Sequence, residues 1–271
     1  MFFDFEYADR RLSDFGCIVC HINTNAGVDD VELGSDITFN TIKNSNSSIH
    51  SITSSSYEDV YTVEFEIMKY ICEDADNVYL SSLEVRQLIK WLNRREYAKF
   101  RPINEISDES DVYYYGSFNI KQVQLGDQIF GLHLTFTANA PYGFSEPNNL
   151  KYMILNDNDT FEVYPESDEL GVIYPTVIIR SLYDGDIKIT NITSGTSVII
   201  KNCKANETIT MDGEYKIITT DNEEHSSTLP NDFNYEYIDI LIDEVYSPNV
   251  YQASKCEIFI NYSPIRKVGV V

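Results

Sequence analysis

Basic side chains are scarce in this 271-residue sequence: 20 Lys and Arg stand against 43 Asp and Glu, which gives a formal net charge of −23. Binding to nucleic-acid phosphates requires a basic surface, so sequence-specific nucleic-acid recognition is excluded as the main role. Long apolar runs are also missing. The opening residues, MFFDFEYADRRLSDF, include acidic side chains at once, so we expect neither a signal peptide nor a membrane anchor.

Catalytic and cofactor motifs are absent as well. The sequence contains no HExxH, no GxSxG, no P-loop and no Rossmann glycine fingerprint. The NDND run at residues 156–159 lacks the glycine and the distal glutamate of a calcium-binding EF-hand, so a hairpin turn is predicted there. We therefore expect no catalytic residue, no cofactor and no metal, and a protein that is not an enzyme.

Cysteines are few and odd in number: Cys17, Cys20, Cys72, Cys203 and Cys256. Their scatter suits reduced thiols that pack as small hydrophobes, and no disulfide is expected. Cys17-Ile-Val-Cys20-His21 fits the CxxCH pattern of haem attachment. In an extended strand, however, residues three apart point to opposite faces, so these two thiols cannot converge on a haem or a metal.

Aromatic residues are plentiful, with 20 Tyr and 14 Phe, and they favour sheets over helices. The length predicts two domains. Alternating apolar positions predict short strands, among them 60–71, whereas the Ser/Asn-rich stretch 43–56 is interpreted as an exposed loop or arm. The Pro- and Gly-containing APYGFSEP predicts a boundary, which gives domains 1–140 and 148–271 with linker 141–147. The tail 265–271 is a candidate for packing back on the first domain.

One amphipathic helix is predicted over residues 81–97. Its apolar positions are Val85, Leu88, Ile89 and Leu92, and Ser81 with Glu84 forms a capping box at its start. A basic cluster of Arg86, Lys90, Arg94 and Arg95 occupies the outer side. Like charges at i and i+4 destabilise a helix slightly, so this cluster is either a solvated face or a subunit interface, and both alternatives stay open.

Several segments carry a resemblance to a known family when they are taken in order. They are the aromatic and DFG start (Phe3, Phe5, Asp14, Phe15, Gly16), LEVRQLIKWLNRREY, VYYYGSF at 112–118, GLHLTFTANAPYGF at 131–144, YPTVIIR and the closing INYSP. In this order they resemble the distal tail proteins of long-tailed, siphovirus-type bacteriophages, which form the hub between tail tube and tail tip. The resemblance covers nearly the whole chain.

The resemblance implies a mostly β fold with one helix. Its first domain would be a small, β-barrel-like, ring-forming unit, and its second a galectin-like β-sandwich. It further implies a homo-hexameric ring in the virion tail, assembled in the host cytoplasm, with the tail tube protein, a tail-tip protein and receptor-binding proteins as partners. No enzymatic activity and no membrane contact go with it. The family has no fixed motif from which contact residues could be assigned.

Two other functions remain open at this point. A carbohydrate-binding module would use exposed tyrosines of the second domain to stack on sugar rings, and glycan contact by that domain is retained as an expectation. Another phage receptor-binding or adhesion protein is the remaining alternative, although the sequence lacks the repeats and coiled-coil heptads typical of such proteins.

Overall fold

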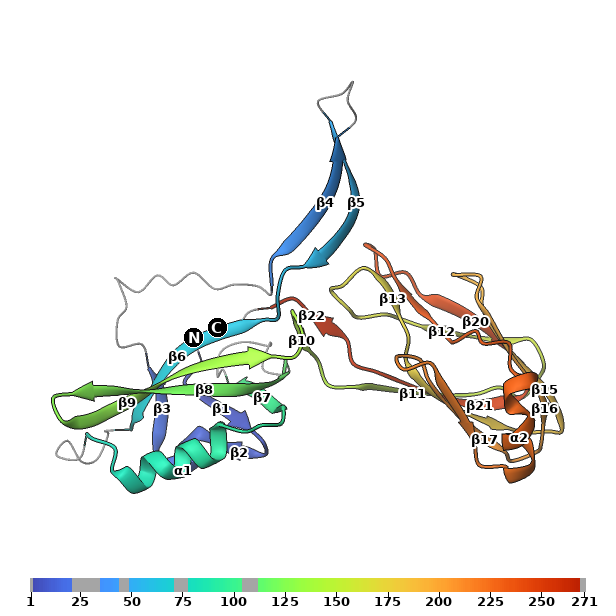
Figure 1. The fold of residues 1–271 in the computed structure, drawn as a ribbon. Helices are drawn as coiled ribbons and strands as arrows, with labels where there is room; N and C mark the ends of the chain where they lie inside the picture. Colours follow the sequence, from blue (N-terminus) through green and yellow to red (C-terminus); the bar gives the residue numbers. More distant parts are fainter. Residues whose placement is uncertain (1, 21–34, 44–48, 71–77, 104–111, 269–271) are drawn as a thin grey trace. The chain divides into compact units, whose positions relative to one another are not determined.

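The computed structural model describes residues 2–20, 35–43, 49–70, 78–103 and 112–268. The chain forms two compact units: Met1–Ser145 together with Arg266–Val271, and Glu146–Ile265. We call them unit 1 and unit 2, and Figure 1 shows the elements of each. The division falls between Ser145 and Glu146, within the Pro- and Gly-containing segment at 140–147. The mostly β architecture predicted from the aromatic content is confirmed.

Unit 1 is built on a seven-stranded sheet in which every neighbouring pair is antiparallel. In spatial order its strands are β2 (Arg10–Arg11), β1 (Asp4–Tyr7), β7 (Ala98–Ile103), β8 (Tyr114–Leu125), β9 (Gln128–Ala138), β6 (Thr62–Lys69) and β3 (Cys17–Cys20). The backbone N–H of Val19 donates to the carbonyl of Phe3 at 3.0 Å, which joins edge strand β3 to the residues before β1. The sheet is therefore curled toward a barrel-like form.

Helix α1 (Ser82–Leu92) buries Val85, Leu88, Trp91 and Leu92 against the aromatic core of unit 1. The predicted capping box is confirmed, with the Ser81 N–H donating to the Glu84 carboxylate at 2.7 Å. The helix ends at Leu92, short of the predicted Tyr97. Asn93 leaves the helical conformation, and its side-chain amide donates to the Phe118 carbonyl at 2.9 Å. This contact with strand β8 accounts for the end of the helix at Leu92, which the sequence pattern of the helix alone does not predict.

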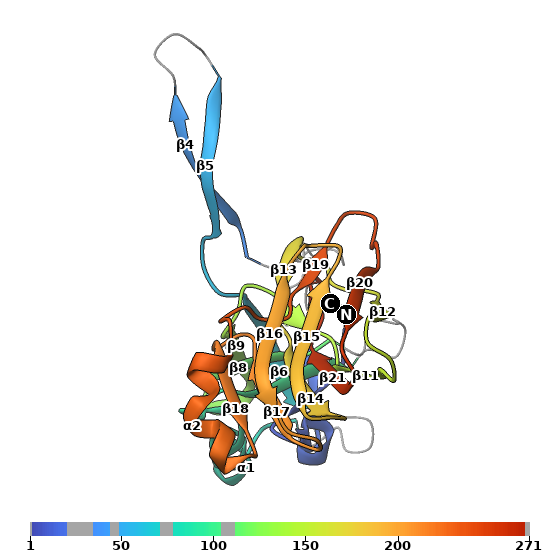
Figure 2. The ribbon, with the colours of Figure 1, turned by 90° about the vertical axis from the view of Figure 1, so that its right-hand side faces the viewer.

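Strands β4 (Ile37–Lys43) and β5 (His50–Tyr57) form a two-stranded antiparallel ribbon whose residues are exposed apart from the half-buried Tyr57. Figures 1 and 2 both show it extending away from the seven-stranded sheet of unit 1. Within the described residues, the segment 43–56, which was interpreted as an exposed loop or arm, is thus an exposed arm of paired strands, and residues 44–48 lie outside the described part of the chain. Backbone pairing satisfies the N–H and C=O groups of the Ser-rich strand β5 without any need for buried side chains.

Unit 2 contains a five-stranded and a four-stranded sheet whose apolar faces share one core. The larger sheet consists of β11 (Asn148–Met153), β21 (Cys256–Tyr262), β14 (Thr176–Ser181), β17 (Thr208–Asp212) and β18 (Ile217–Thr220). The smaller consists of β12 (Asp159–Val163), β20 (Asn249–Ala253), β15 (Gly185–Asn191) and β16 (Ser197–Cys203). A short pair, β13 (Gly171–Ile173) with β19 (Ile240–Ile242), completes the unit.

A second helix, α2 (Glu223–Asp232), is not among the predicted elements. Its first turn is capped by the Asn222 side chain, which accepts from the backbone N–H groups of Glu224 and His225. Only His225 and Leu229 are buried, and Pro230 lies inside it. With so little apolar periodicity, the helix is held by contacts with strands of unit 2 more than by its own sequence.

The end of the chain returns to unit 1. Strand β22 (Ile265–Arg266) pairs with β10 (Gly143–Phe144), and the Arg266 guanidinium donates to Ser145 Oγ at 2.7 Å. Val268 packs against the unit 1 core, where its carbonyl accepts from the Tyr114 hydroxyl at 2.5 Å. Among the described residues, no helix is both long and apolar enough to cross a membrane.

Candidate interaction surfaces and a buried polar cluster

The predicted basic cluster divides into two parts. Arg86 and Lys90 are exposed on the outer face of α1, one helical turn apart. Arg94 and Arg95 lie beyond the end of the helix. Arg94 Nε donates to the Trp91 carbonyl at 2.9 Å, so this side chain satisfies the C-terminus of α1. Arg86 and Lys90 therefore form one exposed basic surface on α1, whereas Arg94 caps the end of the same helix.

The β4–β5 ribbon has two unlike faces. Residues directly opposite across an antiparallel pair point to the same side, and successive residues alternate between sides. From the register, one face carries Ile37, Phe39, Thr41, Lys43, His50, Ile52, Ser55 and Tyr57, and the other carries Thr38, Asn40, Ile42, Ser51, Ser54 and Ser56. Ile37, Phe39 and Ile52 on the first face are 47%, 54% and 62% exposed. The first face, which we call the apolar face, thus carries most of the ribbon's large apolar side chains together with Lys43 and His50, and the second carries Ile42 among polar residues.

The ribbon also differs from the rest of the chain in charge. Residues 37–57 contain no Asp or Glu, and Lys43 is their one Lys or Arg, within a chain of net charge −23. Because like-charged surfaces repel, a segment without carboxylates can approach a strongly acidic protein at lower electrostatic cost than any average stretch of this sequence.

The CxxC cysteines lie on β3, where Cys17 is buried and Cys20 is half-buried, in agreement with the predicted alternation along a strand. Burial raises the pKa of both thiols to about 11, so they are protonated at neutral pH. The cysteines within the described residues are free, and Cys72 and His21 fall outside them. That Cys17 and Cys20 bind no metal or haem stays a prediction.

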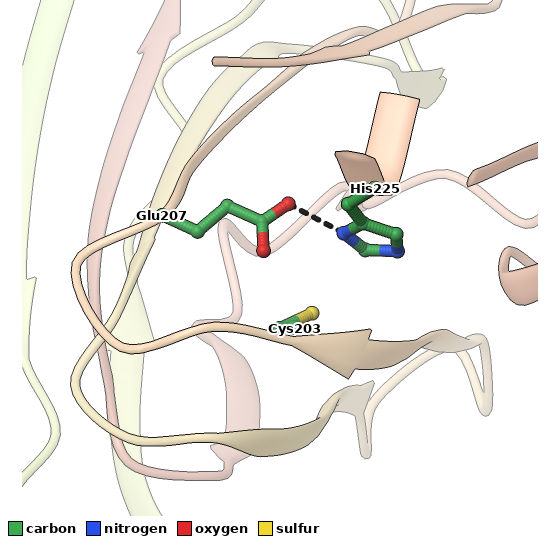
Figure 3. A group of neighbouring side chains, drawn as sticks. All are labelled: Cys203, Glu207 and His225. Atoms are coloured by element: carbon green, nitrogen blue, oxygen red, sulfur yellow. Dashed lines mark hydrogen bonds and ion pairs between the residues drawn. The ribbon is translucent and has the colours of Figure 1, made fainter. Parts of the chain in front are cut away.

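A polar cluster lies buried in unit 2, formed by Cys203 at the end of β16, Glu207 in the turn before β17, and His225 in the first turn of α2 (Figure 3). One ligand-type atom from each residue lies within 4.8 Å of the other two. His225 Nδ1 and Glu207 Oε1 are 2.5 Å apart, and their side chains are 3% and 1% exposed.

Glu207 is the centre of this cluster. Besides the histidine contact, its carboxylate accepts from the Lys204 backbone N–H at 2.8 Å and from the Thr220 hydroxyl at 2.5 Å. Burial, with a further contribution from the Glu207 charge, raises the pKa of the Cys203 thiol to about 12. The three residues belong to no linear motif, since His225 is separated from Glu207 by a strand and a turn. Sequence reasoning therefore missed the cluster, and no signal short of the fold could have found it.

Comparison with known proteins gives the class of the chain. A family model described as the phage tail protein N-terminal domain matches residues 1–140, and one described as the phage tail C-terminal domain matches residues 142–262. Among solved structures, the Dit (gp 19.1) protein of phage SPP1, described as a paradigm of the hub adsorption apparatus in phages infecting Gram-positive bacteria, has 13% sequence identity and a TM-score of 0.64, covering 97% of this chain and 99% of that one.

A chain of the phage P2 baseplate in its activated conformation is 13% identical with a TM-score of 0.44, covering 96% of this chain and 98% of that chain. No curated protein sequence matched. The fold and the domain matches define a structural protein of a phage tail, a component of the virion and not an enzyme. The chain belongs to the phage tail protein family whose N-terminal and C-terminal domains these two models describe.

Proposed function

We propose that the protein is the distal hub of the tail: a homo-hexameric ring that joins the tail tube to the tail-tip protein and carries receptor-binding proteins during host attachment. The hub fold shared with the Dit protein of SPP1 supports this assignment. The main support for assembly into a ring is the exposed ribbon of β4 and β5, which has an apolar face and lacks carboxylates.

The ribbon fits a second copy of this chain as its partner. A two-stranded hairpin is marginally stable by itself in water, so docking on a neighbour supplies stability that the ribbon lacks. Ile37, Phe39 and Ile52 would lose exposed apolar surface there, worth about 25 cal/mol for each Å² removed from water. Because the ribbon has no acidic side chain, it can lie on an acidic neighbour without like-charge repulsion.

The acidic charge suits the channel of such a ring. DNA that passes through a lumen lined by carboxylates is repelled by its walls and does not adhere to them. The same charge opposes the approach of neighbouring copies, which is why contact segments should be apolar or basic, as the ribbon and the outer face of α1 are.

The test compares charge insertion on the two faces of the ribbon. The variant Phe39→Glu/Ile52→Glu places carboxylates on the apolar face, and Thr38→Glu/Ser51→Glu places the same charge on the polar face as a matched control. Light scattering coupled to size exclusion, with negative-stain imaging, measures assembly, and circular dichroism checks the fold. We expect wild type and control to form rings and the apolar-face variant to be monomeric.

Two results would contradict the proposal. A wild-type protein that remains a monomer across micromolar concentrations, and binds glycans on an array, would favour the carbohydrate-binding alternative. Rings that form equally well in both variants would show that the ribbon does not join the copies.

A further inference from the structure

We propose that Cys203, Glu207 and His225 form a binding site for a first-row transition-metal ion of the zinc class in unit 2, beyond any role in the tail hub. The three side chains supply a sulfur, an oxygen and a nitrogen ligand from three separate elements, and all three are buried. Thiolate and imidazole ligands select zinc or cobalt over calcium and magnesium, which prefer oxygen.

The spacing fits such an ion after small local adjustments. Zinc lies about 2.3 Å from sulfur and about 2.0–2.2 Å from nitrogen and oxygen, so tetrahedral ligand atoms stand roughly 3.3–3.7 Å apart. The ligand atoms of Cys203, Glu207 and His225 lie within 4.8 Å of one another. The longest of these separations therefore exceeds the tetrahedral ligand spacing only slightly, and a small shift of the Cys203 sulfur would bring it into range. The 2.5 Å between Glu207 Oε1 and His225 Nδ1 must widen, because the ion takes the place of the proton between them.

The surroundings of His225 favour a ligand on Nδ1. A histidine that coordinates through one ring nitrogen carries its proton on the other, and that N–H usually faces a carboxylate. Nε2 of His225 is buried, makes no hydrogen bond within the described part of the chain, and lies 3.7 Å from Asp232 Oδ2. Asp232 is itself held by the Asn202 side-chain amide at 2.8 Å. A metal on Nδ1 would place the N–H where this carboxylate can accept it.

Binding releases the Cys203 thiol proton to solvent, whereas His225 keeps its single ring proton on Nε2, and a water molecule fills the fourth position. Glu207 remains oriented by the Lys204 N–H and the Thr220 hydroxyl. The ion would link the end of β16, the turn before β17 and helix α2. Because it binds the folded state alone, it would raise the unfolding temperature of unit 2.

The alternative to a metal ion in this cluster is an additional proton on His225. An imidazolium between Glu207 and Asp232 would satisfy both ring nitrogens without any metal. Cobalt distinguishes the two, since a cobalt–thiolate bond gives a charge-transfer band in the near ultraviolet that a protonated histidine cannot give.

The experiment titrates the full-length, chelator-treated protein with cobalt chloride and with zinc chloride. We expect a stoichiometric charge-transfer band, its displacement by zinc, and a higher thermal midpoint with zinc. Cys203→Ser should abolish the band, and Asp232→Asn should weaken zinc binding by about 10–100-fold, as loss of a carboxylate partner of a ligating histidine does. Cys17→Ala/Cys20→Ala is the matched control and should retain the band.

The outcomes separate clearly. Wild-type protein that gives no band and no zinc-dependent stabilisation overturns the proposal and leaves the protonated cluster. A band that persists in Cys203→Ser but disappears in Cys17→Ala/Cys20→Ala would place the metal on β3 instead. If Cys203→Ser fails to fold, a wild-type band that Cys17→Ala/Cys20→Ala retains still excludes β3, and a wild type without a band still overturns the proposal.

Discussion

In unit 1, the side chain of Trp91 connects three parts of the fold. Its ring stacks on Phe5 at 5.6 Å and on Phe15 at 4.4 Å between centroids, and its indole N–H donates to the Tyr7 carbonyl at 2.8 Å. Helix α1, strand β1 and the turn before β3 therefore meet at one side chain. The pattern of the helix predicted that Leu88 and Leu92 face the core, but only the fold reveals this polar contact of the tryptophan.

Replacing Trp91 with Phe should keep much of the apolar packing and remove the donor. The Tyr7 carbonyl would then be buried without that partner, which costs about 1–3 kcal/mol. Urea unfolding of the purified protein measures the loss in free energy of unfolding. Tyr97→Phe, which changes an exposed ring, is the control and should have no measurable effect. Equal stability of Trp91→Phe and wild type would mean that the hydrogen bond contributes nothing net.

Glu84 gives a prediction on pH. Burial acts to raise its pKa, but hydrogen bonds from Lys69 and Ser81 and the Lys69 charge outweigh burial and lower the pKa from 4.5 to about 2. A carboxyl whose pKa is lower in the folded state stabilises the protein above its unfolded pKa. This contribution should be lost as the pH falls from 4.5 to about 2.

The variant Glu84→Gln tests that window. Comparing urea unfolding at about pH 6 with about pH 3 should show a smaller acid-induced loss of stability in the variant than in wild type. Glu96→Gln, at an exposed position after the helix, should lose as much as wild type. An identical pH dependence in wild type and Glu84→Gln would show that the contact between Glu84 and Lys69, at 2.9 Å, does not affect folding.

The secondary-structure elements show what local sequence could predict. Helix α1 was found because its periodicity and its Ser81–Glu84 capping box lie within a single segment. Helix α2 has no such signal because it depends on contacts with strands of unit 2, and the partner of β4 is set by backbone pairing of residues 37–43 with residues 50–57. The end of α1 was misplaced for the same reason, since Asn93 responds to the distant Phe118.

The outer face of α1 supplies a prediction on assembly. Charge reversal at Arg86 and Lys90 together should weaken ring formation or docking of the tube or tip partner, because these cations would otherwise face acidic surface on a neighbour. Lys188→Glu/Lys201→Glu, at exposed positions of unit 2, changes the net charge equally and should have little effect. Sizing at low and high salt measures both. If the Arg86/Lys90 variant assembles as wild type does, the face is solvated.

For the molecule as a whole, the charge of −23 follows from composition, and a boundary that contains Pro and Gly predicts two domains. The sequence makes residues 265–271 a candidate for packing on the first domain, but no pattern in IRKVGVV names the residues that they would contact. In the structure, the Val268 carbonyl accepts from the Tyr114 hydroxyl, and β22 pairs with β10.

Removing Arg266–Val271 should therefore destabilise unit 1 and leave unit 2 unchanged. The truncated chain loses the Val268 carbonyl that accepts from Tyr114, the packing of Val268 on the core and the Arg266–Ser145 contact. Calorimetry should show one transition shifted to lower temperature and one retained. A fragment of residues 146–265 should unfold cooperatively at the midpoint of the retained transition, because unit 2 has its own core. If both transitions shift, or if the fragment is insoluble, the two units do not fold independently.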